Sequence, residues 1–239
     1  MLIKTKAIVL SKLRYKDNDL IVKCFTKHRG VVSYMLRGVL NSKKGTSKAA
    51  YYQLLSQLQI EENYKQTKTL QTIKEVRLDY AFESLHTHIL KSSIVMFLSE
   101  VLSSVLREEE ENPSLYNYLE TTFRWLDVQD EFSNFHLLFL INLTKHLGCY
   151  PDTTNMDATY FNLNNGLFET KKDSRYSVSG ENFIILKQLL GMNFDEVNDI
   201  KLNSKQRQSF LNMLLMYFEL HLGSFKKPKS LQIFNQVFN

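Results

Sequence analysis

The spacing of apolar residues changes once along this chain of 239 residues, near Tyr80, and the change separates two kinds of structure. Before Tyr80, short segments rich in Thr, Val and Ile alternate in part with polar residues and are separated by polar turns. After it, apolar residues recur at intervals of three and four. Alternation is typical of half-buried strands, and intervals of three and four are typical of amphipathic helices. We therefore expect an α+β fold with a boundary at Asp79–Phe82, between a domain of residues 1–80 and a domain of residues 81–239.

The N-terminal domain contains five predicted strands. Gly30 lies between two of them, where a tight hairpin needs the positive φ that glycine adopts without strain. The polar run over Gly38–Ala49 has no hydrophobic period and predicts a loop. Five short strands in a segment of this length are typical of a small closed barrel, so we predict a five-stranded OB-type β-barrel. The strands are predicted over Leu2–Leu10, Leu20–Phe25, Val31–Leu36, Tyr51–Ile60 and Thr69–Leu78.

The rest of the chain is predicted to be a mostly α-helical domain. Ser179 and Ser204 precede two of its apolar runs and are suited to cap the helix N-termini. Residues 150–177 form an irregular insert, in which Asn164-Asn165-Gly166 indicates a hairpin within Tyr160–Phe168. The tail over Phe225–Asn239 has no clear pattern. The first helical segment, Tyr80–Leu106, is predicted as one helix or two in series. The other helices are predicted over Ser114–Val128, Phe132–Leu147, Ser179–Leu190 and Ser204–Leu222.

Positive charge is concentrated in the predicted barrel. Residues 1–80 carry 16 Lys and Arg against 6 Asp and Glu, whereas residues 81–239 carry 14 against 19. Clustered cations displace the counterions of a phosphate backbone, which drives binding that does not depend on sequence. A lysine-rich solvated surface is the alternative, and charge alone favours nucleic-acid binding over it only modestly.

The candidate nucleic-acid-binding residues lie in or next to the predicted turns and the long loop. An OB-type barrel binds single strands with a basic groove and with aromatic side chains that stack on bases. Phe25 and Tyr34 belong to apolar strands and are candidates for the core, most clearly Phe25. Tyr15 lies in a turn, where stacking and simple exposure are equally good explanations. The candidate set is Arg14, Tyr15, Lys16, Lys27, Arg29, Arg37, Lys43, Lys44 and Lys48.

No catalytic or cofactor motif is found. The chain has no HExxH, no Walker-type loop and no GxSxG, and its histidines are not spaced as ligands of one ion. We therefore expect a protein that is not an enzyme and that has no cofactor. No run of residues is long and apolar enough to span a membrane. Cys24 and Cys149 are far apart in sequence and lie in segments that look buried, which favours reduced thiols in a cytosolic protein.

Several segments, in order along the whole chain, resemble the RecO recombination-mediator proteins of bacteria. The resemblance begins with Ala7-Ile8-Val9-Leu10, Arg14-Tyr15 and Asp19-Leu20-Ile21, which are similar to the opening strands of that family. It continues with the hairpin Phe25–Val32 and the basic loop that starts at Arg37-Gly38-Val39. The last matching segment is Leu147-Gly148-Cys149-Tyr150-Pro151, which resembles the Leu-Gly-x-x-Pro that closes a long helix in the second domain.

The resemblance implies a role in recombinational DNA repair. Proteins of this family bind single- and double-stranded DNA and anneal complementary strands. They act with the RecR protein and with the C-terminal tail of single-strand-binding protein to help load the recombinase. The resemblance therefore implies a cytoplasmic, nucleoid-associated DNA-binding protein with those partners and no membrane contact.

One feature of many family members is missing here. They carry a four-cysteine zinc site soon after the Leu-Gly-x-x-Pro, and a structural zinc needs about four Cys or His ligands at close spacing. Residues 152–177 contain neither Cys nor His. We expect no zinc, with the hairpin at Tyr160–Phe168 in the place of the site.

Two other functions remain open on the sequence. The first is a helical adaptor whose basic barrel binds acidic protein tails, and the second is an RNA-binding OB protein, because RNA and DNA are distinguished by geometry that a sequence does not show. The preference for single or double strands, the partner-binding surface and the oligomeric state are also open. The segment Phe210–Phe225, with Lys187 or Lys205 nearby, is either a docking surface for an apolar, acidic tail or simply core.

Overall fold

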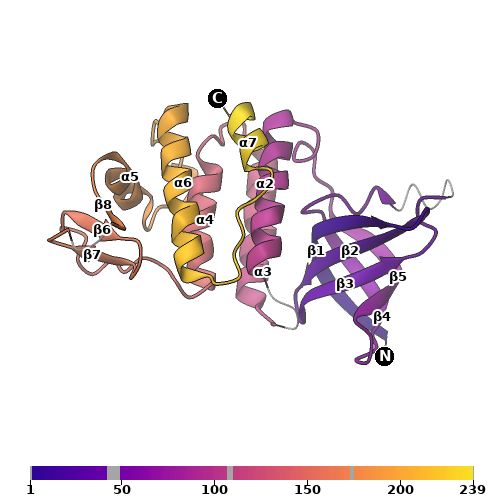
Figure 1. The fold of residues 1–239 in the computed structure, drawn as a ribbon. Coiled ribbons are helices and arrows are strands. Elements are labelled where there is room, and N and C mark those ends of the chain that lie inside the picture. Colours follow the sequence, from indigo (N-terminus) through magenta and orange to yellow (C-terminus); the bar gives the residue numbers. More distant parts are fainter. Residues whose placement is uncertain (1, 42–48, 107–109, 173–174, 239) are drawn as a thin grey trace. The chain divides into compact units, whose positions relative to one another are not determined.

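A closed five-stranded barrel is built from the first third of the chain, as the strand pattern predicts (Figure 1). The computed structural model describes residues 2–41, 49–106, 110–172 and 175–238. The strands follow the order β1-β2-β3-β5-β4 around the barrel, and β1 closes it by pairing antiparallel with β4. Among the described strands, only β3 and β5 pair in parallel, through Ser33–Leu70 and Tyr34–Gln71. The strands are β1 (Leu2–Tyr15), β2 (Asp19–Thr26), β3 (Gly30–Leu36), β4 (Gln57–Asn63) and β5 (Leu70–Tyr80).

Two aromatic residues predicted to be structural are both buried. Tyr34 lies inside the barrel with Cys24, and burial raises the pKa of both groups. Phe25 points to the outside of the barrel, where its ring centroid lies 6.1 Å from that of Tyr116 on a helix. Neither ring is therefore exposed for stacking on a base.

The prediction of a strand from Tyr51 is wrong over its first six residues, because β4 begins only at Gln57. Before it, the chain makes two turns, with Tyr52 N–H donating to Ala49 O and Ser56 N–H donating to Gln53 O, each at 3.1 Å. These turns bury Tyr52 in the barrel core. The apolar residues of this segment therefore close one end of the barrel instead of extending a strand.

Two helices belong with the barrel. Contacts divide the chain into unit 1, Met1–Val128 with Pro228–Ser230, and unit 2, Gln129–Lys227 with Leu231–Asn239. Unit 1 thus contains α2 (Ile89–Val105) and α3 (Pro113–Val128) as well as the barrel.

The first predicted helix starts nine residues later than its apolar pattern suggests, at Ile89 instead of Tyr80. The Asp127 carboxylate accepts hydrogen bonds from the backbone N–H groups of Glu83, Ser84 and Leu85, at 2.7–3.0 Å. His86 lies 2.8 Å from Leu54 O through its Nε2. These contacts with residues distant in sequence replace the bonds that a helix over this segment would make.

Unit 2 is mostly helical and carries a small three-stranded sheet in the order β7-β6-β8. The hairpin predicted at Asn164-Asn165-Gly166 is confirmed, and Gly166 has φ +73°. Helices α4 and α6 lie side by side (Figure 1). The C-terminal tail, for which the sequence predicts no helix or strand, contains α7. The elements are α4 (Phe135–His146), β6 (Tyr160–Asn162), β7 (Leu167–Glu169), β8 (Ser177–Val178), α5 (Glu181–Leu189), η1 (Phe194–Glu196), α6 (Ser204–His221) and α7 (Leu231–Val237).

The two predicted N-caps are both displaced by one residue. Asn203, not Ser204, caps α6, and it forms a reciprocal capping box with Gln206. Asn is as good a cap as Ser, so local propensity does not decide between them. At α5 the capping position is Gly180, one residue after Ser179, and it has φ +69°.

We expect Gly30→Ala to destabilise the protein by about 3 kcal/mol, because it combines backbone strain with steric overlap. Gly30 has φ +61°, and a Cβ there would lie 2.5 Å from Glu110 O and 2.7 Å from Glu110 N. Gly38→Ala is the matched control, since Gly38 has φ +63° but no described atom within 4 Å of its Cβ position. We expect about 1 kcal/mol there. Urea unfolding of the three proteins measures both values, and equal losses would contradict the contact with Glu110.

Candidate nucleic-acid interface

The predicted site residues divide between the two ends of the barrel. The β1–β2 turn and the connector after β3 lie at one end and are hydrogen-bonded to each other. Gly38 N–H donates to Asp19 Oδ1 at 2.7 Å, and Leu40 N–H donates to Asn18 O at 3.1 Å. The β2–β3 turn lies at the other end of β2. The predicted site residues that the structure describes therefore do not form a single patch.

Four predicted residues gather at the first end, which we call the hairpin end: Arg14, Tyr15, Lys16 and Arg37. All four side chains are exposed, and that of Tyr15 is 41% exposed. Lys16 Nζ lies 5.6 Å from the centroid of the Tyr15 ring. Arg14 Nη2 donates to the backbone oxygen of Asp17 at 2.9 Å, so this hydrogen bond does not neutralise the charge of Arg14. The predicted residues Lys43, Lys44 and Lys48 follow Arg37 in the same connector but lie outside the described residues.

Arg29, at the other end, has a structural task that the sequence did not indicate. Its guanidinium forms an ion pair with Glu62, whose side chain is completely buried. It also lies 4.1 Å from the centroid of the Tyr64 ring. A buried carboxylate without a partner is strongly destabilising, so the charge of Arg29 is needed within the barrel. Because its side chain is only 21% exposed, little of that charge faces solvent.

The loop between β4 and β5, next to Arg29, is held by the buried amide of Gln71. Its Oε1 accepts from Lys65 N–H at 2.9 Å, and its Nε2 donates to Lys65 O at 2.9 Å and to Lys68 O at 2.6 Å. The loop and the β2–β3 turn line a groove of about 370 Å³. Glu111 also lines it, with Oε1 3.6 Å from His28 Nδ1. A carboxylate at this position makes the groove less favourable for phosphate than the hairpin end.

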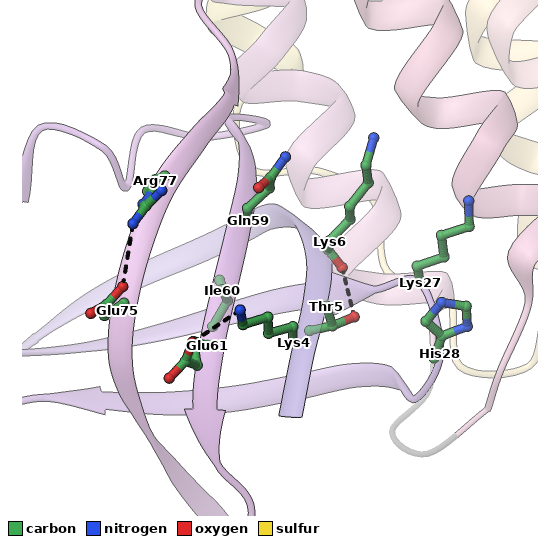
Figure 2. A pocket seen from close by; sticks show the side chains of 10 residues that line it. All are labelled: Lys4, Thr5, Lys6, Lys27, His28, Gln59, Ile60, Glu61, Glu75 and Arg77. Atoms are coloured by element: carbon green, nitrogen blue, oxygen red, sulfur yellow. Dashed lines mark hydrogen bonds and ion pairs between the residues drawn. The ribbon is translucent and has the colours of Figure 1, made fainter. Parts of the chain in front are cut away.

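A second groove, of about 440 Å³, crosses the outer face of β1, β4 and β5 (Figure 2). Figure 2 shows Lys27 and His28 at one side of it and Glu75 and Arg77 at the other. Its cations are interleaved with carboxylates: Arg77 pairs with Glu75 at 3.6 Å. Lys27 is the one predicted site residue among those that line it. This mixed-charge surface is less suited than the hairpin end to attract a phosphate backbone. The groove is lined by Lys4, Thr5, Lys6, Lys27, His28, Gln59, Ile60, Glu61, Glu75 and Arg77.

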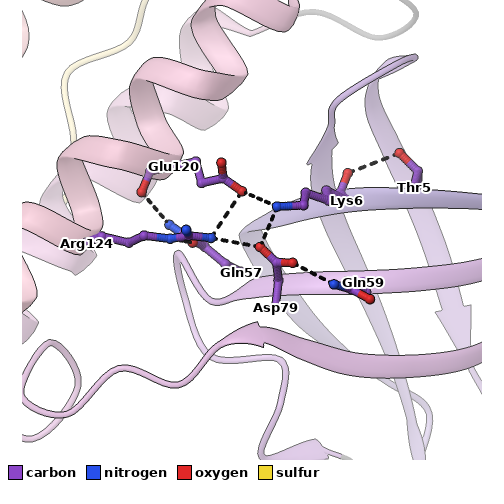
Figure 3. A network of polar contacts seen from close by, with 7 residues as sticks. All are labelled: Thr5, Lys6, Gln57, Gln59, Asp79, Glu120 and Arg124. Atoms are coloured by element: carbon purple, nitrogen blue, oxygen red, sulfur yellow. Dashed lines mark hydrogen bonds and ion pairs between the residues drawn. The ribbon is translucent and has the colours of Figure 1, made fainter.

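Lys6 belongs to an ion-pair network between the barrel and α3 (Figure 3). Its Nζ lies 2.9 Å from both Asp79 Oδ2 and Glu120 Oε1. Arg124 Nη2 contacts the same two carboxylates, at 2.8 Å and 3.2 Å. Gln57 adds two hydrogen bonds, accepting from Arg124 Nε at 2.7 Å and donating to Glu120 O at 2.8 Å. Both cations of the network are thus neutralised inside unit 1.

The pKa of Asp79 is lowered from its usual value of 3.8. Burial alone would raise it, and the side chain is only 5% exposed. Hydrogen bonds from Gln59 and Lys6, together with the positive charges of Lys6 and Arg124, outweigh burial. A carboxyl with a lower pKa in the folded state than in the unfolded state stabilises the fold above the unfolded-state pKa. That stabilisation is lost as the pH falls through the folded-state pKa.

Burial shifts the pKa of titratable groups in unit 2. Burial raises the pKa of the Cys149 thiol to about 11 and lowers that of His136 to about 3, so both are uncharged at neutral pH. Within the described ranges, no group of three or more His, Cys, Asp or Glu could hold a metal ion. In the segment Phe210–Phe225, most of the large apolar side chains are core, and Met216 is 41% exposed. No described helix is long and apolar enough to cross a membrane.

We expect Asp79→Asn to destabilise the protein by about 2 kcal/mol at neutral pH, because it removes the charge that Lys6 and Arg124 share. The difference from wild type should stay constant down to about pH 4 and shrink below it, as the wild-type carboxyl becomes protonated. Urea unfolding at a series of pH values measures this difference. The matched control is Asp17→Asn, an exposed carboxylate, for which we expect a change within about 0.5 kcal/mol at every pH. A loss for Asp79→Asn that persists unchanged in acid would contradict the ionic role.

Comparison with known proteins agrees with the fold. A family model described as "Recombination protein O N terminal" matches residues 1–82, and one described as "Recombination protein O C terminal" matches residues 86–232. The chain is 46% identical over 238 residues to DNA repair protein RecO of Christiangramia forsetii, covering all of both chains. The proteins of the same name from Flavobacterium johnsoniae and Flavobacterium psychrophilum are 44% and 42% identical over 239 residues, again over the full length of both chains. The chain therefore belongs to the RecO family of DNA repair proteins.

Proposed function

We propose that this protein binds DNA through the hairpin end of its barrel, without sequence preference, and that it is not an enzyme. The observation that carries the proposal is the exposure of Arg14, Lys16 and Arg37 at an end whose two segments are hydrogen-bonded together. Fixed, exposed cations release counterions from a phosphate backbone at little cost in ordering. We include Lys43, Lys44 and Lys48 in the interface, because their connector starts at this end.

In recombinational repair, the protein would bind and anneal DNA strands. It would also help to load a recombinase onto single strands coated by single-strand-binding protein. This assignment follows from membership of the RecO family together with the basic barrel. We further propose a cytoplasmic, nucleoid-associated location. The functional division is proposed at the end of β5, with residues 1–80 as the DNA-binding domain and residues 81–239 as the helical domain.

Two protein partners are proposed on the same basis: a RecR-like protein and the C-terminal tail of single-strand-binding protein. For the acidic, apolar tail, unit 2 offers a groove of about 620 Å³ between α5 and residues 192–202. Ile184, which is 56% exposed, and Ile200 line it, as does the cation Lys201. The carboxylates of Glu181 and Asp199 also line it, and Glu181 Oε1 accepts from Gln206 Nε2 at 2.6 Å. The apolar side chains suit the apolar part of such a tail, and Lys201 can pair with its terminal carboxylate.

Replacing Arg14, Lys16 and Arg37 together by Ala should weaken binding to single-stranded DNA. It should also flatten the slope of log K against log salt by up to about two units, at roughly 0.7 per phosphate contact. The fold should survive, since exposed cations bury little. The matched control replaces the exposed Lys171, Lys172 and Lys226 of unit 2, which removes the same charge elsewhere. Fluorescence anisotropy at several salt concentrations measures both. If the two triple variants lose affinity and slope equally, net charge and not the hairpin end drives binding.

Ile184→Glu should weaken binding of an acidic, apolar tail peptide by about tenfold, because it places a carboxylate in the groove. Leu167→Glu is the control, since Leu167 is 43% exposed and lies on β7. Anisotropy with a labelled peptide measures the two affinities. Undiminished binding to the Ile184 variant would rule out this groove as the tail site.

A further inference from the structure

An apolar row crosses the outer face of the barrel at the hairpin end. Leu13 on β1 is paired with Ile21 on β2, and Ile21 is paired with Met35 on β3. Directly paired residues of neighbouring antiparallel strands point to the same face, so the three side chains form one line. Tyr15 lies on the same face as Leu13, two positions along β1. Leu13 is 64% exposed and Tyr15 is 41% exposed, while Ile21 and Met35 are half-buried.

A β-bulge places this row on the outside. Val9 is paired with Cys24 and points into the barrel core. The register of β1 against β2 shifts between Val9 and Ser11, so that one extra residue is inserted. After the bulge, odd-numbered residues of β1 point outward, and Leu13 does so. The sequence alternation continued without the bulge would have directed Leu13 inward.

The charges around the apolar row indicate which kind of ligand fits it. Three cations border the row: Lys23 lies on the same face, two positions from Ile21 on β2, Lys16 Nζ lies 5.6 Å from the centroid of the Tyr15 ring, and Arg37 follows β3. Lys12 and Arg14 alternate with the apolar residues on β1, so they point to the opposite face of the strand. Two carboxylates, those of Asp17 and Asp19, lie nearby, and Asp19 Oδ1 accepts a hydrogen bond from Gly38 N–H. A strip of apolar side chains bordered by cations complements a polymer with apolar faces and a charged backbone.

We propose that Leu13, Ile21 and Met35, with Tyr15, form a platform for unstacked bases of single-stranded DNA, and that the barrel for this reason prefers single strands to duplex. This inference rests on the proposed DNA binding. It adds that the bases of the DNA, and not only its phosphates, contact the barrel. Single strands expose base faces that can stack on aromatic side chains, and Leu, Ile and Met side chains make the same kind of contact where bases are unstacked. In a duplex the base faces are hidden, and only the phosphates can reach the surrounding cations.

The test compares Leu13→Ser with wild type, in the full chain, on three ligands. These are a mixed-sequence single strand, an abasic strand of the same length, and the corresponding duplex. Leu13→Ser should bind the normal single strand about fivefold more weakly. It should bind the abasic strand and the duplex as wild type does, with the same salt dependence, because it removes no phosphate contact. Leu78→Ser is the matched control, since Leu78 is 41% exposed on β5, and it should leave all three affinities unchanged.

A gain of affinity gives an independent check. Leu13→Phe should bind the normal single strand about threefold more tightly, because an aromatic ring stacks better on a base than an aliphatic chain does. Equal effects of Leu13→Ser on normal and abasic strands, or no effect on either, would overturn the platform. So would an acidic, apolar peptide that binds wild type but not Leu13→Ser while DNA binding is unchanged. A wild-type protein that binds none of the three ligands would instead overturn the proposed DNA binding itself.

Discussion

A small set of charges on one face of α3 determines what the barrel is attached to. Glu120, Arg124 and Asp127 follow one another at intervals of four and three, so they share a face of the helix. Glu120 and Arg124 meet Lys6 and Asp79 of the barrel, and Asp127 holds the chain that leaves β5. The period of apolar residues changes at Tyr80, but these contacts make the barrel, α2 and α3 one compact unit. Breaking such a network is costly because every partner left behind is a buried or half-buried charge.

The sequence predicted the strands and turns where local chemistry decides the structure. Gly30 and Gly166 adopt the positive φ that their hairpins require, and the alternating segments became the five strands. The failures lie where distant residues decide. Nothing in residues 81–88 shows that Asp127, some forty positions away, will accept their N–H groups in place of a helix. The turns before β4 are likewise stabilised by the burial of Tyr52 in a core formed by other strands.

For the candidate site, the sequence shows that cations are concentrated in the barrel, but it does not show which of them are paired with carboxylates. Lys6 and Arg29 count as barrel cations in the sequence, yet each is neutralised by a carboxylate of unit 1. The glutamate that Arg29 pairs with reads as a polar turn residue, because its burial depends on how β4 pairs with its neighbours. The positions of Arg14, Lys16 and Arg37 in or next to turns predict their exposure, because turns at the end of a barrel face solvent. The apolar row could not be found at all, since a bulge that changes the direction of Leu13 is set by strand pairing.

Cations near the end of β1 also protect a strand edge that is exposed because β1 is longer than its partner β4. Closure of a barrel removes free strand edges, but β1 pairs with β4 only from Leu2 to Ile8. Its last residues, through Tyr15, pair with β2, and no other described strand pairs with their second edge. An open edge invites pairing with another chain, and charged side chains are the usual protection against it. Lys12 and Arg14 sit on this edge segment, so they disfavour pairing between copies of the protein while remaining attractive to phosphate. Around its turn the hairpin carries Lys12, Arg14 and Lys16 against Asp17 and Asp19, so its net charge is positive. A positive net charge repels a second copy of the hairpin and attracts a phosphate backbone.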